Sequence, residues 1–274
     1  MNVIRLGDIT LGDGEPFFIA GPCVIESEDH AVRLAGMLRD IFRRLGRSFI
    51  FKASYDKANR SSVRSFRGPG PAEGLRILAR IRREFDLPIL TDVHDCGQVA
   101  AAAEVADILQ VPAFLSRQTD LLLAVGAAGR VVNVKKGQFL APWDMANVVD
   151  KIRSTGNSRI LLTERGFTFG YNNLVVDFRS LAIMRRLDCP VVFDATHSVQ
   201  LPGGAGCASG GEAEYIQPLA RAAVACGVDG LFFEVHDDPA NALCDGPNAF
   251  PIQSFEAFVR RLLDIHRAAH GGQS

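Results

Sequence analysis

Side chains that could bind anions, hold a metal ion or move protons stand at the ends of eight short apolar runs in this 274-residue chain. In chain order they are Cys23, Lys52, Ser54, Asp92, Gln110, Asn133, Lys135, Arg165, Asp194, His197 and Glu234. One polar residue at a strand end is common, because a strand must leave the core somewhere. Reactive groups after every run are not typical of a purely structural sheet, so we expect them to form one site.

Basic side chains make up the first chemical group at these run ends. They are Lys52, Lys57, Arg60, Lys135, Lys136 and Arg165. For any one of these residues, a solvated position on a loop is as good an explanation as a role in anion binding. Gathered at one mouth they would repel each other unless an anion joined them, and ammonium and guanidinium groups suit phosphate and carboxylate. The number is sufficient for two anionic groups, such as two phosphates.

A mixed set of possible metal ligands makes up the second group. Cys23, His197 and Glu234 follow the first, seventh and eighth runs, which become neighbours if the sheet closes. Asp245 lies on a Gly-Pro turn after the eighth run and could fold back over the same place. Thiolate, imidazole and carboxylate donors suit Zn²⁺, Fe²⁺ or Mn²⁺ better than Mg²⁺.

Cys23 and His197 also have competing interpretations. A lone cysteine is more often a buried core thiol, and His94 or His236 could take the place of His197. A nucleophilic Cys23 is less favoured, because its nearest partner, Glu26, would raise a thiol pKa. A disulfide is not expected, since the six cysteines show no CxxC pair and thiols of a cytosolic chain are reduced.

The elements that must position these side chains repeat eight times as an apolar run and a helical segment. The runs span residues 17–23, 49–54, 88–93, 108–113, 131–136, 160–165, 191–196 and 231–236. They are rich in Val, Ile, Leu and Phe, as strands buried on both faces are. Helical periodicity is clearest over residues 31–46, 73–85, 214–227 and 255–269. The alternation predicts parallel strands joined by crossovers, and eight units fit a closed (β/α)₈ barrel that forms a single domain over residues 1–274.

The segment before the first long run predicts a short β-hairpin. Residues 3–18 contain turns at Leu6-Gly7-Asp8 and Gly12-Asp13-Gly14, and we expect this hairpin to cap one end of the barrel. No Gly-x-Gly-x-x-Gly follows the first run, which argues against dinucleotide binding. Active sites of such barrels lie at the carboxyl ends of the strands, where the reactive groups are expected.

Composition narrows the classes of partner. The chain is 47% hydrophobic with a formal net charge of -1, which argues against nucleic acid or an anionic membrane as the main partner. No uninterrupted apolar run of transmembrane length is present. The N-terminus carries acidic residues and no long apolar core, unlike a secretory signal. We therefore expect a cytoplasmic protein.

Eight motifs together resemble one enzyme family. They are GPCVIES, KASYDKANRSS, TDVHD, LQVPAFLSRQTDLL, NVKKGQF, TERGFTFGYNNLVVD, DATHSVQLPGG and FFEVHDDPANALCDGPN. Their order and content are similar to the 3-deoxy-D-manno-octulosonate 8-phosphate synthases from about Phe17 to the last helix. The resemblance implies a transferase on a (β/α)₈ barrel, usually a homotetramer. The implied reaction condenses phosphoenolpyruvate with D-arabinose 5-phosphate and releases inorganic phosphate, a step toward the Kdo sugar of lipopolysaccharide.

The alternative within this resemblance is a 3-deoxy-D-arabino-heptulosonate 7-phosphate synthase, which uses erythrose 4-phosphate. Those relatives share a GPC-type first strand but typically carry a KPR[TS] segment where this chain has Lys57-Ala58-Asn59-Arg60-Ser61-Ser62. The resemblance also implies metal dependence, because members with cysteine at the position of Cys23 need a divalent ion and members with asparagine do not. Its ligands would be Cys23, His197, Glu234 and Asp245, in matching motifs.

The resemblance implies roles for further residues. Those matching the phosphoenolpyruvate site are Lys52, Ser54, Lys57, Gln110, Lys135 and Arg165, with Lys135 and Arg165 on the phosphate. Asn59, Arg60 and Ser61 match the sugar phosphate pocket, where the family borrows Arg-Ser from a neighbouring subunit, and Asp92 is expected among the substrate-binding residues. Cys23, Lys57, His197 and Asp245 are the expected catalytic residues.

Two other functions are possible for these residues, and one loop has a predicted role. A barrel aldolase could use Lys135 as a Schiff-base amine, and it would need no metal ion. A phospho-sugar sensor on the same barrel would bind without releasing phosphate, which the density of reactive strand ends disfavours. The glycine-rich loop 203–212 could act as a lid near the metal ligands.

Overall fold

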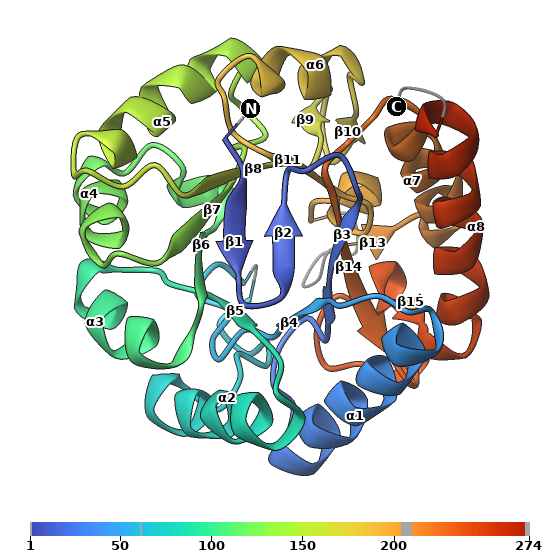
Figure 1. Cartoon of the computed structure of the whole chain (residues 1–274). Coiled ribbons are helices and arrows are strands. Elements are labelled where there is room, and N and C mark those ends of the chain that lie inside the picture. The colour runs from blue at the N-terminus through green and yellow to red at the C-terminus, as the bar shows by residue number, and fades with distance from the viewer. Residues whose placement is uncertain (1, 61, 204–209, 272–274) are drawn as a thin grey trace.

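Eight parallel strands close into a barrel in the computed structural model, which describes residues 2–60, 62–203 and 210–271. The strands are β3 (Phe17–Gly21), β4 (Ile50–Lys52), β5 (Ile89–Asp92), β6 (Ile108–Val111), β7 (Val131–Lys135), β8 (Ile160–Glu164), β11 (Val191–Asp194) and β14 (Gly230–His236). Each pairs in parallel with the next, and β14 closes the ring by pairing with both β11 and β3. The predicted (β/α)₈ barrel is confirmed, with all eight runs in place (Figure 1).

A ring of helices covers the outside of the barrel (Figure 1). The helices are α1 (Glu28–Arg44), α2 (Pro71–Phe85), α3 (Cys96–Val105), α4 (Thr119–Ala127), α5 (Met145–Arg153), α6 (Arg179–Arg185), α7 (Ile216–Ala225) and α8 (Ile252–His270). α1 shows why they form where they do. Ser27 caps it by accepting a hydrogen bond from the backbone N–H of His30 at 3.2 Å, and its first turn is acidic and its last turn basic, as the helix dipole favours. Its buried side face packs against the outward-facing residues of the strands.

Inside the barrel, the half nearer the amino-terminal ends of the strands is apolar. The side chains that pack there include Phe17, Ile19, Ile50, Leu90, Ile108, Val131, Leu161, Val192 and Phe232. The hairpin of β1 (Ile4–Leu6) and β2 (Ile9–Leu11) adds Ile4, Ile9 and Leu11 to this cluster. Because the cluster is made of residues early in each strand, the hairpin closes the amino-terminal end of the barrel, as predicted (Figure 1).

The half of the barrel interior nearer the carboxyl ends of the strands is polar. Side chains alternate along a strand, so every second residue faces inward. On every barrel strand except β3, the inward position two residues beyond an apolar one carries a polar side chain. Ile50 is followed by Lys52 and Leu90 by Asp92, both of them buried. The other members of this layer are Gln110, Asn133, Lys135, Thr163, Asp194 and Glu234. Closure of the barrel therefore brings these polar groups together, next to the apolar cluster inside it.

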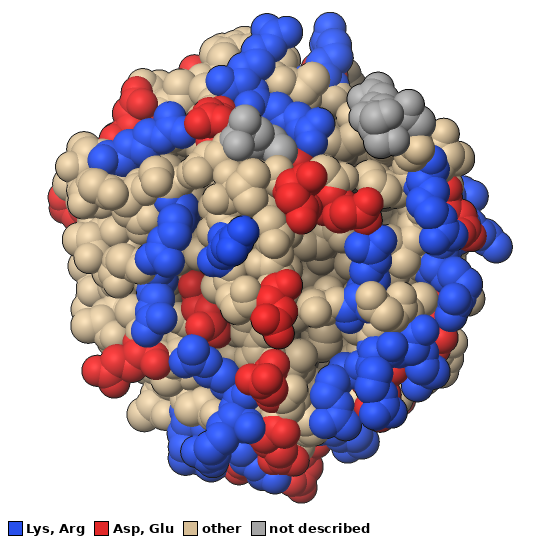
Figure 2. All heavy atoms as spheres, viewed as in Figure 1, with Lys and Arg blue, Asp and Glu red and all other residues tan. Residues whose placement is uncertain are grey.

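Short paired segments decorate the carboxyl end of the barrel. They are the hairpin of β9 (Phe167–Thr168) and β10 (Leu174–Val175), the hairpin of β12 (Gln200–Leu201) and β13 (Gly210–Gly211), and β15 (Phe250–Pro251), which extends β14. Residues 204–209, in the middle of the predicted lid, lie outside the described residues. None of the described helices is long and apolar enough to cross a membrane. On the face around the hairpin, basic and acidic side chains are interspersed, with basic ones most frequent at its lower right (Figure 2).

Candidate active site

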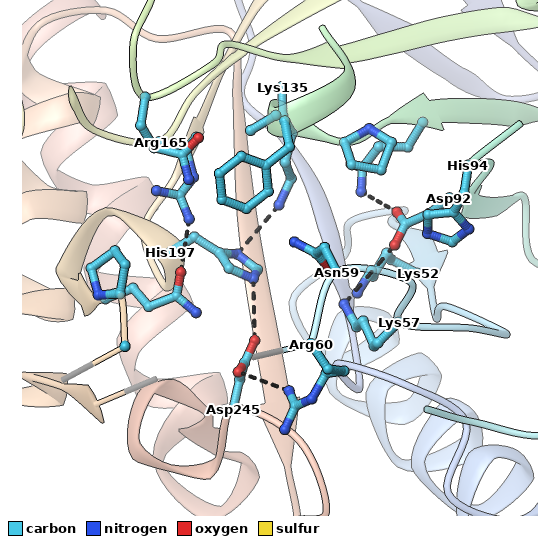
Figure 3. Close-up of a pocket in the computed structure, with 18 residues that line it drawn as sticks. Lys52, Lys57, Asn59, Arg60, Asp92, His94, Lys135, Arg165, His197 and Asp245 are labelled. Carbon is cyan, nitrogen blue, oxygen red and sulfur yellow. Dashed lines mark hydrogen bonds and ion pairs between the residues drawn. The ribbon is translucent and has the colours of Figure 1, made fainter. Parts of the chain in front are cut away.

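A pocket opens at the carboxyl ends of the barrel strands, opposite the hairpin. Its walls carry most of the side chains singled out from the sequence (Figure 3). Those lining it are Lys52, Lys57, Asn59, Arg60, Asp92, His94, Gln110, Lys135, Arg165, His197 and Asp245. The strands supply the floor and the loops after them supply the rim, so the expected convergence of run ends on one site is confirmed.

Four possible metal ligands from three strand ends and one loop approach each other at one side of the pocket. Nε2 of His197 lies 3.4 Å from Oε1 of Glu234 and 3.9 Å from Oδ2 of Asp245. The Cys23 sulfur lies 3.6 Å from the same Oδ2 atom of Asp245. Asp245 therefore joins two groups of three donors, one with His197 and Glu234 and one with Cys23 and Cys244, each of which could hold a metal ion.

Asp245 reaches this position through an unusual backbone conformation. Its φ angle is +48°, in the left-handed region that Asp and Asn tolerate better than most residues. The Gly246-Pro247 turn follows it directly, and the backbone N–H of Asn248 donates to the Asp245 carbonyl at 2.9 Å. The turn thus folds the segment after β14 back over the mouth, as the sequence predicted.

His197 is oriented by a buried carboxylate. Oδ2 of Asp194 lies 2.7 Å from Nδ1 of His197, and Oδ1 accepts the backbone N–H of His197 at 2.9 Å. The same carboxylate pairs with Lys135, whose Nζ lies 3.3 Å from Nδ1 of His197. Burial alone would raise the pKa of Asp194, but His197 and Lys135 hold it below its usual value. An ionised Asp194 keeps the proton of His197 on Nδ1 and leaves Nε2 free to coordinate.

Cys23 is a free thiol with a second cysteine beside it. Its sulfur lies 2.8 Å from that of Cys244, and both residues are buried. Nη1 of Arg60 lies 2.8 Å from the Cys244 sulfur and 3.4 Å from Oδ1 of Asp245. Burial, and then the neighbouring Cys244, raise the pKa of Cys23 well above its usual value. A nucleophilic role for Cys23 is therefore disfavoured, because the reactive thiolate is scarce.

Lys52 and Lys57 both approach the same carboxylate oxygen of Glu234. Nζ of Lys52 donates to Oε1 of Glu234 at 2.9 Å and to the carbonyl of Cys23 at 2.8 Å. Nζ of Lys57 lies 3.6 Å from the same Glu234 oxygen. Burial lowers the pKa of Lys57, but negative charge nearby, on Cys23 when it is ionised and on the Glu234 and Asp92 carboxylates, raises it well above its usual value. Lys57 consequently stays protonated at neutral pH.

A chain of buried hydrogen bonds links the neighbouring strands β8, β7, β6 and β5 inside the barrel. Thr163 donates to Oδ1 of Asn133 at 2.7 Å, and Asn133 donates to Oε1 of Gln110 at 2.8 Å. Gln110 then donates to Asp92, which also accepts the hydroxyl of Ser54. Every member is buried, so the chain fixes the rotamers of Gln110 and Asp92 where they line the pocket.

The basic residues divide into two groups. Lys52, Lys57, Arg60, Lys135 and Arg165 line the pocket. Lys136 was expected with them, but its Nζ lies 3.6 Å from Oε1 of Glu164 and donates to the carbonyl of Leu140, away from the pocket. Neighbouring residues of a strand point to opposite faces, so Lys135 and Lys136 could not both face inward.

The mutual repulsion expected among these cations is largely offset inside the protein. Asp92, Asp194, Glu234 and Asp245 lie among the five basic residues of the pocket and pair with four of them. Arg165 instead donates to Oε1 of Gln200 at 2.9 Å, and burial lowers its pKa. The expectation that an anion alone must hold the cations together is therefore wrong.

Some candidate site residues could not be assessed in the structure, and some site residues were not predicted from the sequence. Arg60 reaches the pocket of its own chain, and the sharing of this site with a neighbouring subunit stays a prediction. Ser61 lies outside the described residues. Cys244 was missed as a site residue, although its position directly before Asp245 was a usable signal. Thr163 was missed as well, and counting two residues on from Leu161 would have found it.

Comparison with known proteins identifies the family. A model of the DAHP synthetase I family matches residues 1–269. A 2-dehydro-3-deoxyphosphooctonate aldolase from Syntrophotalea carbinolica is 59% identical over 271 residues, covering 98% of both chains. Proteins of the same name from Geobacter sulfurreducens and Acidithiobacillus ferrooxidans are 60% and 62% identical over 263 residues, covering 96% of this chain and 97% and 94% of theirs.

That name is a synonym of the octulosonate synthase that the sequence motifs resemble, so the resemblance is confirmed and the heptulosonate alternative is not supported. The chain belongs to the DAHP synthetase I family and, within it, to the 2-dehydro-3-deoxyphosphooctonate aldolases, the 3-deoxy-D-manno-octulosonate 8-phosphate synthases.

Proposed function

We propose that this chain condenses phosphoenolpyruvate with D-arabinose 5-phosphate to give 3-deoxy-D-manno-octulosonate 8-phosphate and inorganic phosphate. The observation that carries the proposal is the pocket at the strand ends, where five basic side chains surround a cysteine, histidine and carboxylate donor set. The names of the relatives agree with it. The product is the phosphorylated precursor of Kdo, the sugar of lipopolysaccharide that the motifs imply.

The basic residues are assigned to the two anionic substrates. Lys135 and Arg165 take the phosphate of phosphoenolpyruvate, and Arg165 suits this role because its guanidinium is buried and has no carboxylate within ion-pair distance among the described contacts. Lys52, Ser54, Lys57 and Gln110 hold the rest of phosphoenolpyruvate. Asn59, Arg60 and Ser61 hold the sugar phosphate, with Asp92 among the substrate-binding groups. Fixing two like-charged substrates side by side reduces the entropic barrier to their reaction.

The donor set fits a divalent metal ion on the chemistry of its atoms. Cys23, His197, Glu234 and Asp245 supply one sulfur, one nitrogen and carboxylate oxygens, and Asp194 holds His197 in the tautomer that a metal ligand needs. This mixture suits Zn²⁺, Fe²⁺ or Mn²⁺. When bound, such an ion would supply Lewis acidity and lower the pKa of a bound water.

A divalent ion also accounts for the charge of the pocket. Four carboxylates offset most of the five basic side chains, which leaves little net attraction for two anionic substrates. Positive charge added at the donor set would restore that attraction. Metal binding and anion binding are therefore linked in this proposal.

The bond changes follow from the substrates, and the side chains assist them. C3 of phosphoenolpyruvate forms a carbon–carbon bond to the aldehyde carbon, whose oxygen gains the electron pair and a proton. Lys57, protonated and facing the pocket, donates that proton. Water adds at C2, which the first step has left electron-poor, and loses a proton to Asp245. The C2–O bond to the phosphate then breaks while the C2 hydroxyl gives its proton to the departing phosphate, leaving a C2 ketone and inorganic phosphate.

A phosphate-release assay tests the proposal directly. The protein is incubated with phosphoenolpyruvate and either arabinose 5-phosphate or erythrose 4-phosphate, before and after chelation and after metal is restored. We expect release with arabinose 5-phosphate, loss on chelation and recovery with a divalent ion. Preference for erythrose 4-phosphate, or full activity of metal-free protein, would contradict the proposal. Borohydride trapping of a lysine adduct would instead indicate the Schiff-base aldolase.

The homotetramer and the cytoplasmic location stay predictions. Exposed apolar side chains near the mouth support assembly, because Phe114, Trp143 and Phe169 are 52%, 64% and 68% exposed and such groups often mark interfaces. Light scattering on the purified protein measures the mass, and a monomer that retains full activity would contradict a shared site.

A further inference from the structure

A second cluster of possible metal ligands lies beside the barrel mouth, outside the pocket. Glu26 comes from the segment between β3 and α1, His30 from the first turn of α1, and His236 ends β14. The two histidines are 7% and 6% exposed, and their ring centroids are 4.6 Å apart. The reaction proposed above uses none of these three residues.

The donor atoms of this cluster converge on a small volume. Nε2 of His236 lies 3.3 Å from Oε1 of Glu26, and Nδ1 of His30 lies 3.9 Å from Oε2 of Glu26. One donor atom from each residue lies within 4.8 Å of the others. A small closure of the side chains would bring all three within bonding distance of one ion.

His30 carries the strongest evidence, because one of its ring nitrogens is buried and has no partner. Nε2 of His30 lies 2.9 Å from Oδ1 of Asp237, whereas Nδ1 makes no hydrogen bond. The Asp237 carboxylate is also paired with Arg33, whose Nη2 lies 2.8 Å from Oδ2. It accepts the His30 proton on Nε2 and leaves a bare lone pair on Nδ1 that faces Glu26.

A lone pair facing a carboxylate across 3.9 Å is unfavourable unless a proton or a metal cation lies between them, and a metal cation can in addition use the nearby His236 ring. The second ring can adapt to the same cation. Nδ1 of His236 accepts the backbone N–H of Asp238 at 2.9 Å and lies 3.4 Å from Oδ1 of Asp237. For Nε2 to coordinate, the His236 proton moves to Nδ1 and is donated to Oδ1 of Asp237, and the backbone N–H of Asp238 gives up its hydrogen bond to Nδ1.

We propose that Glu26, His30 and His236 form a second transition-metal site, distinct from the site in the pocket. Two imidazoles and one carboxylate suit Zn²⁺, Co²⁺ or Ni²⁺ and do not suit Mg²⁺ or Ca²⁺. Asp237 is the outer carboxylate that orients a metal-bound histidine, an arrangement common around zinc.

The site would join the start of α1 to the segment that carries Asp245. Oε1 of Glu26 accepts the backbone N–H of Leu243 at 2.8 Å, and Cys244 and Asp245 follow directly. An ion here would therefore hold in place the loop that covers the pocket, and its role is structural.

Cobalt binding to tag-free protein tests the proposal. Metal-free wild-type protein, His30→Gln and Glu26→Gln are titrated with Co²⁺ while bound metal is counted by elemental analysis after desalting. Glu26→Gln retains an oxygen that can accept the Leu243 N–H, so it serves if His30→Gln does not fold. His266→Gln is the matched control, since His266 is 8% exposed and lies outside the cluster.

We expect both cluster variants to bind one Co²⁺ per chain fewer than wild type and the control. The lost equivalent should have the visible bands of nitrogen and oxygen ligation without a thiolate-to-cobalt charge-transfer band. Such a band would report Cys23, so failure of the pocket site and failure of the second site give different results. Equal stoichiometry in wild type and both cluster variants would overturn the proposal.

Discussion

Oδ2 of Asp194 lies 2.7 Å from Nδ1 of His197, and this contact turns Nε2 toward Glu234 and Asp245. The carboxylate thus acts on the donor set through a ring that it holds, without being a donor itself. The same oxygen pairs with Lys135. One buried side chain therefore positions both a proposed metal ligand and a proposed phosphate-binding amine.

Asp194→Asn should weaken metal binding by about 10–100-fold, the usual effect of losing an outer carboxylate. It should also raise KM for phosphoenolpyruvate, because Lys135 loses its ion pair and its orientation. Competition with a metal indicator measures the first effect and phosphate release the second. Asp229→Asn is the control, since Asp229 is equally buried but pairs with Arg185, away from the pocket. Unchanged metal affinity in Asp194→Asn would show that the carboxylate does not support a ligand.

Cys23→Asn should lower metal content and remove the dependence of activity on metal, because the sulfur donor is lost. Some metal-free activity is expected, since the asparagine class of the family works without an ion. Cys189→Ser is the matched control, as Cys189 is a buried free thiol remote from the donor set. Elemental analysis and chelator sensitivity are the measurements. A Cys23→Asn protein with wild-type metal content would exclude Cys23 as a ligand.

Ile4→Ala should destabilise the protein by about 2–5 kcal/mol while leaving KM for both substrates unchanged. Ile4 is 2% exposed within the hairpin and packs inside the barrel at the end opposite the pocket. Val3→Ala is the control, because Val3 is 48% exposed and should cost little. Urea unfolding and steady-state kinetics separate the two effects. Equal stability of the two variants would show that the hairpin does not contribute to the core.

Glu28→Gln should destabilise the protein at pH 6 and lose this effect in acid. Hydrogen bonds from Arg76 and Arg80 lower the pKa of Glu28 to about 2 from its usual 4.5. The pair therefore adds stability above pH 4.5, and the contribution fades as pH falls toward 2. Urea unfolding of both proteins at pH 6, 4 and 3 measures the difference, which should shrink in that order. A constant difference would mean that the charge of Glu28 is not responsible.

The barrel could be predicted from the sequence because apolar runs and helical segments alternate so regularly. Most of the site could then be predicted too, because a closed barrel brings its strand ends together regardless of the conformation of its loops. The error over Lys136 has a simple cause. Two adjacent lysines end the same run, and only the two-residue period of the strand decides which one faces inward. Applied to every strand, that period would also have found Thr163.

Contacts made by loops were harder to predict. Cys23 and Cys244 meet only because the segment after β14 folds back through the left-handed Asp245, and no local pattern fixes that path. The charge balance was missed for a similar reason. Basic residues were counted as a group, whereas Asp194 and Glu234 lie between them only in the closed barrel.

The hairpin that closes the amino-terminal end of the barrel has a consequence for how reactants pass in and out. With that end packed by Ile4, Ile9 and Leu11, the described residues leave the pocket open at the carboxyl end of the barrel, where reactants would pass in and out. A substrate that lies deeper in such a pocket would have to arrive before one that lies nearer the mouth. A barrel closed at one end therefore favours an ordered sequence of binding and release.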